Sequence, residues 1–301
     1  MMLNLSHSVL NFFVAGGQWL QRLSNGNSNT QGFSVRQPQH QQGQVWLIGA
    51  GPGDAELLTL KAYRLIQNAD VVMYDWLVNP DILNMIPSAV ERVFVGKKCG
   101  QHSMQQADIC QLLVDVAQQG KNIVRLKGGD PAIFGRLAEE CDILTQHNID
   151  FAVVPGITSA SGMSAYSGIP LTHRDCAQSV RFITAHMKHV EQEPDWSTLV
   201  PTAGQKSNET LVFYMGLNRL ATISQRLIAH GMTATMPIAV IDQATLSAQK
   251  VCTGTLADIS ERVGSADFQG PALIIVGEVV TKRQGVNLAM LQQSTMANTE
   301  A

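Results

Sequence analysis

The chain has 301 residues, of which 45% are hydrophobic and 15% charged, and its formal net charge at pH 7 is -3. This is enough apolar material for two ordinary domains. The slightly acidic balance excludes a general attraction to nucleic acid or to an anionic membrane, because either would need a clear basic excess. An acidic ligand has to be met by a local group of basic residues.

The cysteines and the hydropathy narrow the class of protein further. Five cysteines are scattered along the chain without a CxxC pair, so neither a disulfide framework nor a zinc knuckle is predicted, and a reducing cytoplasm fits best. His186 and His189 have i, i+3 spacing without a visible third ligand, so no metal site is predicted. No run of about 18 apolar residues is present, which argues against a transmembrane helix.

The first 44 residues are predicted to be a poorly ordered extension. Residues 24–44 consist largely of Asn, Gln, Ser and Gly, a composition that buries too little surface to offset chain entropy. An apolar cluster at 9–20 is interrupted by polar residues and lacks the basic start and cleavage site of a secretion signal. It is consistent with a short amphipathic helix in a loose tail or with a docking segment.

The folded part is predicted to begin at residue 45 with alternating strands and helices. Apolar runs indicate strands at 45–48, 70–74, 92–95, 123–126 and 151–154, and periodic apolar positions indicate helices at 57–67, 109–117 and 137–146. Such alternation favours a mostly parallel sheet with helices on both faces. We assign residues 45–175 to this first α/β domain.

A second α/β domain is assigned to residues 176–281. A helix rich in small residues is expected at 157–168, as suits a helix packed closely beside a ligand or a domain junction. The later pattern predicts strands at 180–184, 211–214, 238–241, 251–253 and 273–276, and helices at 220–229 and 256–263. The polar segment 191–208 is predicted to be an exposed loop. The chain is expected to fray from Thr281, so residues 282–301 form a flexible tail.

A glycine-rich loop follows the first predicted strand and reads Gly49-Ala50-Gly51-Pro52-Gly53-Asp54. Its position resembles that of a dinucleotide-binding turn, and Asp70 or Asp75 lies at about the spacing of a ribose-binding acid. However, Pro52 removes a backbone N–H, and the Asp54 carboxylate would repel a phosphate. The loop therefore suits a nucleoside without phosphates better than a dinucleotide, or it is simply a tight strand-to-helix turn.

Eight stretches, taken in order, resemble the uroporphyrinogen-III C-methyltransferases of the tetrapyrrole methylase family. They are GAGPGDAELLTL (49–60), VMYDWLV (72–78), VGKKCGQH (95–102), RLKGGDPAIFGR (125–136), VPGITSAS (154–161), GIPLTHRD (168–175), VFYMGL (212–217) and PALIIVGEV (271–279). The resemblance covers about residues 45–281. It implies two α/β domains with a mostly parallel first sheet and a mixed second sheet, a homodimer, and S-adenosylmethionine held between the domains without a metal.

The resemblance also implies which residues contact the methyl donor. These are Pro52, Gly128, Gly129, Asp130, Ile133, Thr158, Ser159, Met215 and the backbone of Ala244. Glycines allow close approach of the backbone, Asp130 can accept hydrogen bonds from ribose hydroxyls, and Ile133 and Met215 can pack on adenine. Core packing remains the alternative for Met215, and a plain turn the alternative for the two glycines.

By the same resemblance, Asp75 is the proton acceptor and Lys97 the proton donor. Each follows a predicted strand at its carboxyl end, where ligands of open α/β sheets bind. They would serve two successive methylations of uroporphyrinogen III, giving precorrin-1 and then precorrin-2, with S-adenosylhomocysteine as the spent donor. Solvated charges, or groups that merely position substrate carboxylates, are the alternatives.

A local basic region is expected to bind the carboxylates of the substrate. Residues 92–136 contain seven Lys or Arg against three acidic residues. The candidate substrate-binding residues are Lys98, His102, Arg136, His173 and Arg174. Arginine can bind a carboxylate through two parallel hydrogen bonds, although a solvated surface charge is as plausible for each residue alone.

Several positions depart from the pattern of the family. Trp76 stands where an arginine or another polar residue is usual, which puts one contact to a substrate carboxylate in doubt. The other departures are Gln101 for Tyr, Gln105 for Pro, Ala132 for Phe, Leu137 and Ala138 for two glycines, and Ala244 for Gly.

Three other functions stay open: a methyltransferase acting on a later corrin precursor or on RNA or a modified histidine, a non-catalytic tetrapyrrole-binding protein, and a nicotinamide oxidoreductase. The last is disfavoured by Pro52 and Asp54.

Overall fold

The structure is a computed structural model, and it describes residues 42–96, 104–186, 193–202 and 207–292. All four ranges belong to one compact unit of the chain. The expected extension 1–44, apart from its last three residues, lies outside the described residues. So do three candidate site residues, Lys97, Lys98 and His102.

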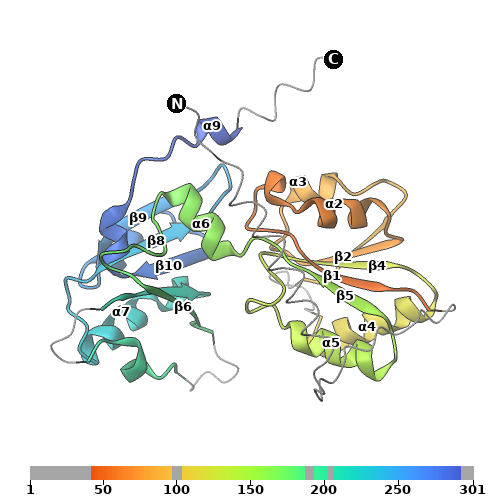
Figure 1. Cartoon of the computed structure of the whole chain (residues 1–301), viewed down its shortest axis with the longest axis horizontal. Coiled ribbons are helices and arrows are strands. Elements are labelled where there is room, and N and C mark those ends of the chain that lie inside the picture. The colour runs from red at the N-terminus through yellow and green to blue at the C-terminus, as the bar shows by residue number, and fades with distance from the viewer. Residues whose placement is uncertain (1–41, 97–103, 187–192, 203–206, 293–301) are drawn as a thin grey trace, which may run out of the picture. The chain divides into compact units, whose positions relative to one another are not determined.

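The first sheet has five parallel strands in the order β3-β2-β4-β1-β5. The strands are β1 Val45–Gly49, β2 Val71–Tyr74, β3 Glu91–Phe94, β4 Ile123–Lys127 and β5 Phe151–Val154. Helices α2 Leu60–Gln67 and α3 Pro80–Asn84 lie on one face, and α4 Gln106–Gln118 and α5 Leu137–Gln146 on the other (Figure 1). The prediction of a largely parallel, doubly covered sheet is confirmed.

Each face of the first sheet has its own apolar core, because successive strand residues point to opposite faces. Val124 and Leu126 belong to the core under α2 and α3. Ile123 belongs to the core under α4 and α5. The residues of β4 that share the second face with Ile123 are Arg125 and Lys127, which are charged yet only 3% and 4% exposed.

The second sheet is mixed, with the order β6-β7-β10-β8-β9. Its strands are β6 Ser179–Thr184, β7 Glu209–Tyr214, β8 Pro237–Asp242, β9 Lys250–Thr255 and β10 Ala272–Val276. Only β6 and β7 pair in parallel, whereas β7–β10, β10–β8 and β8–β9 are antiparallel. This confirms the expected mixed sheet.

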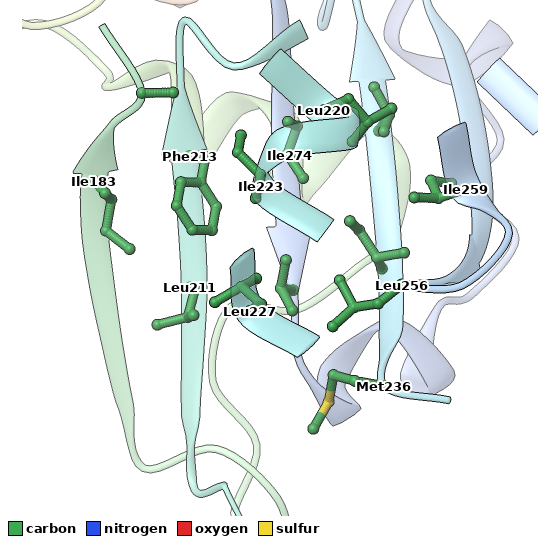
Figure 2. Packing of buried hydrophobic residues seen from close by; sticks show 14 of the residues in the cluster. Ile183, Leu211, Phe213, Leu220, Ile223, Leu227, Met236, Leu256, Ile259 and Ile274 are labelled. Carbon is green, nitrogen blue, oxygen red and sulfur yellow. The ribbon is translucent and has the colours of Figure 1, made fainter. Parts of the chain in front are cut away.

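Helices cover both faces of the second sheet as well. The core beneath α7 Leu220–Ala229 and α8 Ile259–Gly264 is built around the fully buried Phe213 (Figure 2). The opposite face carries the small-residue helix α6 Ser159–Ser167, whose Ala160 and Met163 share a core with β7, β8 and β10. The domain boundary at residue 175 stays a prediction.

The polar segment 191–208 is not simply an exposed loop, so that prediction was wrong in part. Its described residues include a 3-10 helix, η2 Trp196–Leu199, and both of these end residues are buried. The Trp196 ring stacks on Phe213 with centroids 6.2 Å apart, while its Nε1 donates to Glu193 Oε2 at 2.9 Å. A single aromatic anchor in a polar stretch therefore completes the second core.

Three other local differences have clear causes. The helix expected at 57–67 begins only at Leu60, because Asp54 caps the short 3-10 helix η1 Ala55–Leu57 and Thr59 then caps α2. The chain just beyond Thr281 is held rather than frayed, since Arg283 Nε donates to Ser167 O and Gln284 N donates to Gly168 O. Helix α3, which the pattern missed, starts with the Asn79 cap and Pro80.

We predict that Phe213→Ala lowers the free energy of unfolding by ~3–5 kcal/mol, because the substitution leaves a cavity in the core of the second sheet. Urea denaturation measures this directly. The control is Leu60→Ala at a position that is 83% exposed, where a change within about 0.5 kcal/mol is expected. Equal losses for the two variants would contradict the assigned core.

Candidate active site

The loops that leave β1 and β4 are hydrogen-bonded to each other at the carboxyl edge of the first sheet. Gly51 N donates to Gly129 O at 3.1 Å, and Gly129 N donates to Gly51 O at 2.7 Å. The pairing is possible because β1 and β4 are parallel neighbours, with Gly49 opposite Lys127. The structure thus brings together the two glycine segments that the sequence pattern singled out.

Glycine is required in these loops for close packing of the backbone. A Cβ atom at Gly156 would lie 2.3 Å from Gly129 O, and one at Gly49 would lie 2.6 Å from the same oxygen. Gly129 also has a φ of 68°, a region that favours glycine. The ends of β1, β4 and β5 therefore meet without room for any side chain.

Asp54 is a structural residue of the first loop. Its Oδ1 accepts from Glu56 N at 2.9 Å, its Oδ2 accepts from the Tyr166 hydroxyl at 2.5 Å, and its own N–H donates to Thr245 Oγ1 at 3.0 Å. Burial and the hydrogen bond to Asp54 raise the pKa of Tyr166 well above its usual value. The carboxylate is thus built into the loop, which makes the loop a poor place for a phosphate.

Pro52 packs against helix α6, and this contact explains the small residues of that helix. A Cβ atom at Gly162 would lie 2.5 Å from Pro52 Cγ and 3.1 Å from Thr245 Cγ2. Only glycine at this position lets α6 approach both the first loop and the segment after β8. The expectation of a closely packed helix here is therefore supported by direct contacts.

The second loop is shaped by Asp130. Its Oδ1 accepts from Ala132 N at 2.8 Å, and its Oδ2 accepts from Gly156 N at 3.1 Å. Both carboxylate oxygens thus bind the backbone, so a hydrogen bond to a ribose hydroxyl would be additional to this role. Ile133, which we expected to contact a ligand, is partly exposed in the same turn and donates to Asp130 O.

Phe134, which the sequence analysis did not assign, connects this loop to the second sheet. Its ring is 41% exposed and lies 4.9 Å from the ring of Tyr214 in an edge-on arrangement. The Tyr214 hydroxyl is 2.8 Å from Thr158 Oγ1 and accepts from Ala160 N at 3.2 Å. Burial raises the pKa of Tyr214. Tyr214 thus ties the start of α6 to the end of β7.

Met215, Ala244 and Ser159 border the same loops. Met215 directly follows Tyr214 and is 52% exposed, which argues against the core-packing alternative. Ala244 lies between Gln243 and Thr245, both with positive φ. Ser159 Oγ would be 3.1 Å from a Cβ atom at Gly129. Ser159 therefore lies beside the second glycine loop.

Non-glycine residues with positive φ gather in these segments. They are Phe134 (53°), Arg136 (56°), Met215 (56°), Gln243 (48°) and Thr245 (70°), with Asn148 (55°) elsewhere. Such conformations cost free energy and persist where the surroundings hold them. Thr245 is held by the bond from Asp54 N and by its own N–H, which donates to Gln249 Oε1 at 2.9 Å. The pattern is typical of a binding site.

Asp75 lies at the carboxyl edge directly after β2, as predicted. Its Oδ1 accepts from Leu77 N at 3.1 Å, and its Oδ2 is 3.5 Å from Arg125 Nη2. The Asp75 side chain is 21% exposed, whereas Arg125 is buried. Arg125 in turn contacts the buried Glu140 of α5. Sequence reasoning counted Arg125 only as one of several basic residues and missed Glu140 entirely.

The surface next to Asp75 is apolar. Trp76 is 57% exposed, Leu77 44% and Phe94 40%. The Phe94 ring packs edge-on against Tyr74 at 5.6 Å. We call these three exposed residues the Trp76 patch. Exposed aromatic and aliphatic side chains beside a carboxylate suit a ligand with a flat apolar body.

The candidate substrate-binding residues are less clearly assembled. Arg136 is paired with Glu139 through Nε and Nη2, at 2.9 and 2.5 Å. His173 Nδ1 accepts from Asp175 N at 3.3 Å, and Arg174 is exposed. His173 and Arg174 follow α6 in a turn that is closed by hydrogen bonds between His173 and Ala177. Their role in substrate binding stays a prediction, as does that of Lys98 and His102.

Within the described ranges, no group of three or more His, Cys, Asp or Glu residues is arranged to hold a metal ion. In the same part of the chain, none of the helices has the length and apolar character needed to cross a membrane.

Comparisons with known proteins agree on one family. The family model named Tetrapyrrole (Corrin/Porphyrin) Methylases matches residues 44–260 of this chain. Siroheme synthase of Pseudomonas putida is 54% identical over 246 residues, which are 82% of this chain and 52% of that protein. Siroheme synthase of Escherichia coli is 53% identical over 253 residues, 84% of this chain and 54% of the relative. The chain therefore spans about half the length of these curated relatives.

Solved structures lead to the same family. Uroporphyrin III C-methyl transferase from Thermus thermophilus matches with a TM-score of 0.67 and 39% identity, over 79% of this chain and 99% of its own. The complex of that protein with S-adenyl homocysteine matches with the same TM-score and 40% identity, over the same shares of the two chains. A cobalt precorrin-4 methyltransferase matches with a TM-score of 0.70 and 27% identity, over 81% of this chain and 98% of its own.

The fold and the site thus define a methyltransferase built on one parallel and one mixed α/β sheet. The chain belongs to the tetrapyrrole methylase family. This confirms the resemblance and the fold class expected from the sequence.

We predict that Gly156→Ala lowers the free energy of unfolding by about 1–3 kcal/mol, because the new Cβ atom would collide with Gly129 O. The matched control is Gly264→Ala at the end of α8, where a Cβ atom meets nothing within 4 Å. That change is expected to be neutral or slightly stabilising. Thermal unfolding of both variants is the measurement, and equal melting temperatures would contradict the close packing of the loops.

Proposed function

We propose that the chain transfers methyl groups from S-adenosylmethionine to carbon atoms of uroporphyrinogen III, twice in succession, giving precorrin-1 and then precorrin-2. The observation that carries this proposal is the carboxyl edge of the first sheet, where Asp75, backed by buried Arg125, lies beside the two interlocked glycine loops. The 39% identity to a uroporphyrin III C-methyl transferase supports the choice of substrate.

The residues present fit a phosphate-free nucleoside as donor. The loops offer exposed apolar side chains, Met215 and Phe134, for the adenine ring, and at Gly128 and Gly129 a backbone without side chains that a ligand can approach closely. The carboxylates of Asp54 and Asp130 disfavour a pyrophosphate in the same place. Pro52, Ile133, Thr158, Ser159 and Ala244 are the other proposed contacts. The bound donor supplies an electrophilic methyl group on a sulfonium.

The protein's own contribution is alignment and charge. Transfer to carbon requires nucleophile, methyl and sulfur in line, so positioning supplies most of the rate enhancement. Attack by a pyrrole carbon leaves a positive charge on the ring, which then loses a proton. Asp75, held at both oxygens, is placed to stabilise that charge or to accept the proton. Lys97 is proposed as the proton donor.

The substrate is proposed to lie with its macrocycle on the Trp76 patch and its carboxylates toward basic residues. Lys98, His102, Arg136, His173 and Arg174 are the candidates. For Arg136 this requires exchange of its Glu139 partner for a substrate carboxylate. A homodimer in the cytoplasm, with the product passed to sirohaem or cobalamin synthesis, is part of the same proposal. The siroheme synthase relatives support the first of these products.

A methyltransferase acting on a later corrin precursor is the second candidate, because the cobalt precorrin-4 methyltransferase shares the fold with a TM-score of 0.70. Incubation of the purified chain with uroporphyrinogen III and labelled donor, followed by mass spectrometry, separates the candidates. We expect two added methyl groups. Methylation of a cobalt-precorrin alone would favour the second candidate, and tight donor binding without any methylated product would indicate a binding protein.

We predict that Asp75→Asn lowers the rate of methyl transfer by about 100-fold or more, because the variant cannot accept a proton or balance the ring charge. Binding of S-adenosylhomocysteine, measured by calorimetry, is expected to change by less than about two-fold. Asp115→Asn on the exposed side of α4 is the control. An Asp75→Asn variant with normal turnover would contradict the assigned role.

A further inference from the structure

A cluster of buried charges lies behind Asp75, on the face of the first sheet covered by α4 and α5. At its centre is Glu140 of α5, which is completely buried. Its Oε1 is 2.7 Å from Lys127 Nζ and 3.3 Å from Arg125 Nε, and it also accepts from Gln106 Nε2 at 3.1 Å. Three donors from β4 and α4 therefore converge on one oxygen of one carboxylate.

Arg125 connects this cluster to Asp75. Its Nε points to Glu140 Oε1, its Nη1 donates to Leu126 O at 2.9 Å, and its Nη2 is 3.5 Å from Asp75 Oδ2. The guanidinium is planar, so fixing two of its nitrogens fixes the direction of the third. Glu140 and the backbone of β4 thus set how Arg125 faces Asp75.

The charges in the cluster balance as two cations and two carboxylates. Arg125 and Lys127 face Glu140 from one strand, and Asp75 lies at the exposed end. Burial lowers the pKa of Lys127, and Glu140 opposes that shift. Without the charge of Glu140, Asp75 would be the remaining carboxylate of the cluster, and both cations would be drawn to it.

Burying these charged side chains in a core is energetically unfavourable compared with apolar packing. Glu140 Oε2 is buried and has no hydrogen-bond partner in the described part of the chain, and a buried unpaired polar atom carries a free-energy penalty. Replacing a buried ion pair by apolar side chains is often neutral or stabilising. Packing alone therefore does not explain Glu140, whereas its connection to Asp75 does.

We infer that Glu140 is a positioning residue for methyl transfer: it orients Arg125 toward Asp75 and supplies the negative charge that keeps Arg125 and Lys127 from capturing the Asp75 carboxylate. The inference rests on the proposed function in taking Asp75 as the group that meets the reacting ring. Lys127 also directly precedes Gly128, so the same cluster anchors the strand end from which the second glycine loop leaves.

The first test is Glu140→Gln, which keeps the shape of the side chain and removes its charge. We expect the rate of methyl transfer at saturating substrates to fall about 10- to 100-fold, as for a misplaced reacting group. The dissociation constant for S-adenosylhomocysteine should stay within about two-fold. Glu261→Gln on the exposed surface of α8 is the control, and it should leave both quantities unchanged. A Glu140→Gln variant with normal turnover would overturn the inference.

A double-variant cycle separates positioning from a merely structural role. If Glu140 acts through Asp75, Glu140→Gln should slow the residual single-turnover rate of Asp75→Asn by less than about two-fold. A loss as large as in the wild-type background would show that Glu140 acts elsewhere. If Glu140→Gln does not fold, Arg125→Lys replaces it in the cycle, because lysine keeps the charge but cannot contact both carboxylates.

A crystal structure of Glu140→Gln provides a readout that does not depend on activity. We expect the Arg125 guanidinium to leave the substituted side chain and to approach Asp75 more closely than the 3.5 Å between Nη2 and Oδ2. An unmoved Arg125 would overturn the inference. If the wild-type chain transferred no methyl group to uroporphyrinogen III, the proposed function would fail separately, and this structure would still decide whether Glu140 orients Arg125.

Discussion

The site depends on the parallel pairing of β4 with β1 on one side and β2 on the other. Because the three strands run in the same direction, their carboxyl ends lie at one edge, and Gly49, Tyr74 and Lys127 reach it together. Three parts of the proposed site leave from there: the first glycine loop from β1, Asp75 from β2, and the second glycine loop from β4. A shift in the register of β4 would separate all of these groups at once.

The same edge contains several features that are unfavourable for the stability of the fold. Three glycine backbones meet without side chains, five residues with side chains adopt positive φ in the surrounding segments, and two cations lie under the sheet. Each of these features costs free energy and is held by contacts from other segments, such as the bond from Asp54 N to the Thr245 side chain and the contacts of Glu140 with Arg125 and Lys127. A fold selected for stability alone would avoid them, whereas the proposed alignment of a methyl donor with its substrate requires a rigid frame.

The sequence was sufficient for most of the strands, since apolar runs such as 123–126 and 273–276 are short, buried and bounded by turn residues. It also predicted correctly that both glycine loops and Asp75 follow strands of the first sheet at their carboxyl ends. It was not sufficient for contacts that depend on tertiary placement. The residues around Trp196 do not indicate that its ring stacks on Phe213. Glu140 looks like an ordinary polar helix residue in the sequence, because its contacts with Arg125 and Lys127 arise only when α5 packs on the sheet. The alternation of Ile123, Arg125 and Lys127 on one face of a buried strand was the available signal.

In the proposed function, the carboxyl edge of the first sheet holds a phosphate-free adenosyl compound next to Asp75. A crystal structure of the chain with S-adenosylhomocysteine tests this most directly. We predict that the nucleoside binds against Gly128, Gly129 and Met215, with its sulfur directed toward Asp75. A nucleoside bound elsewhere, or a preference of these loops for a pyrophosphate compound in a competition experiment, would contradict it.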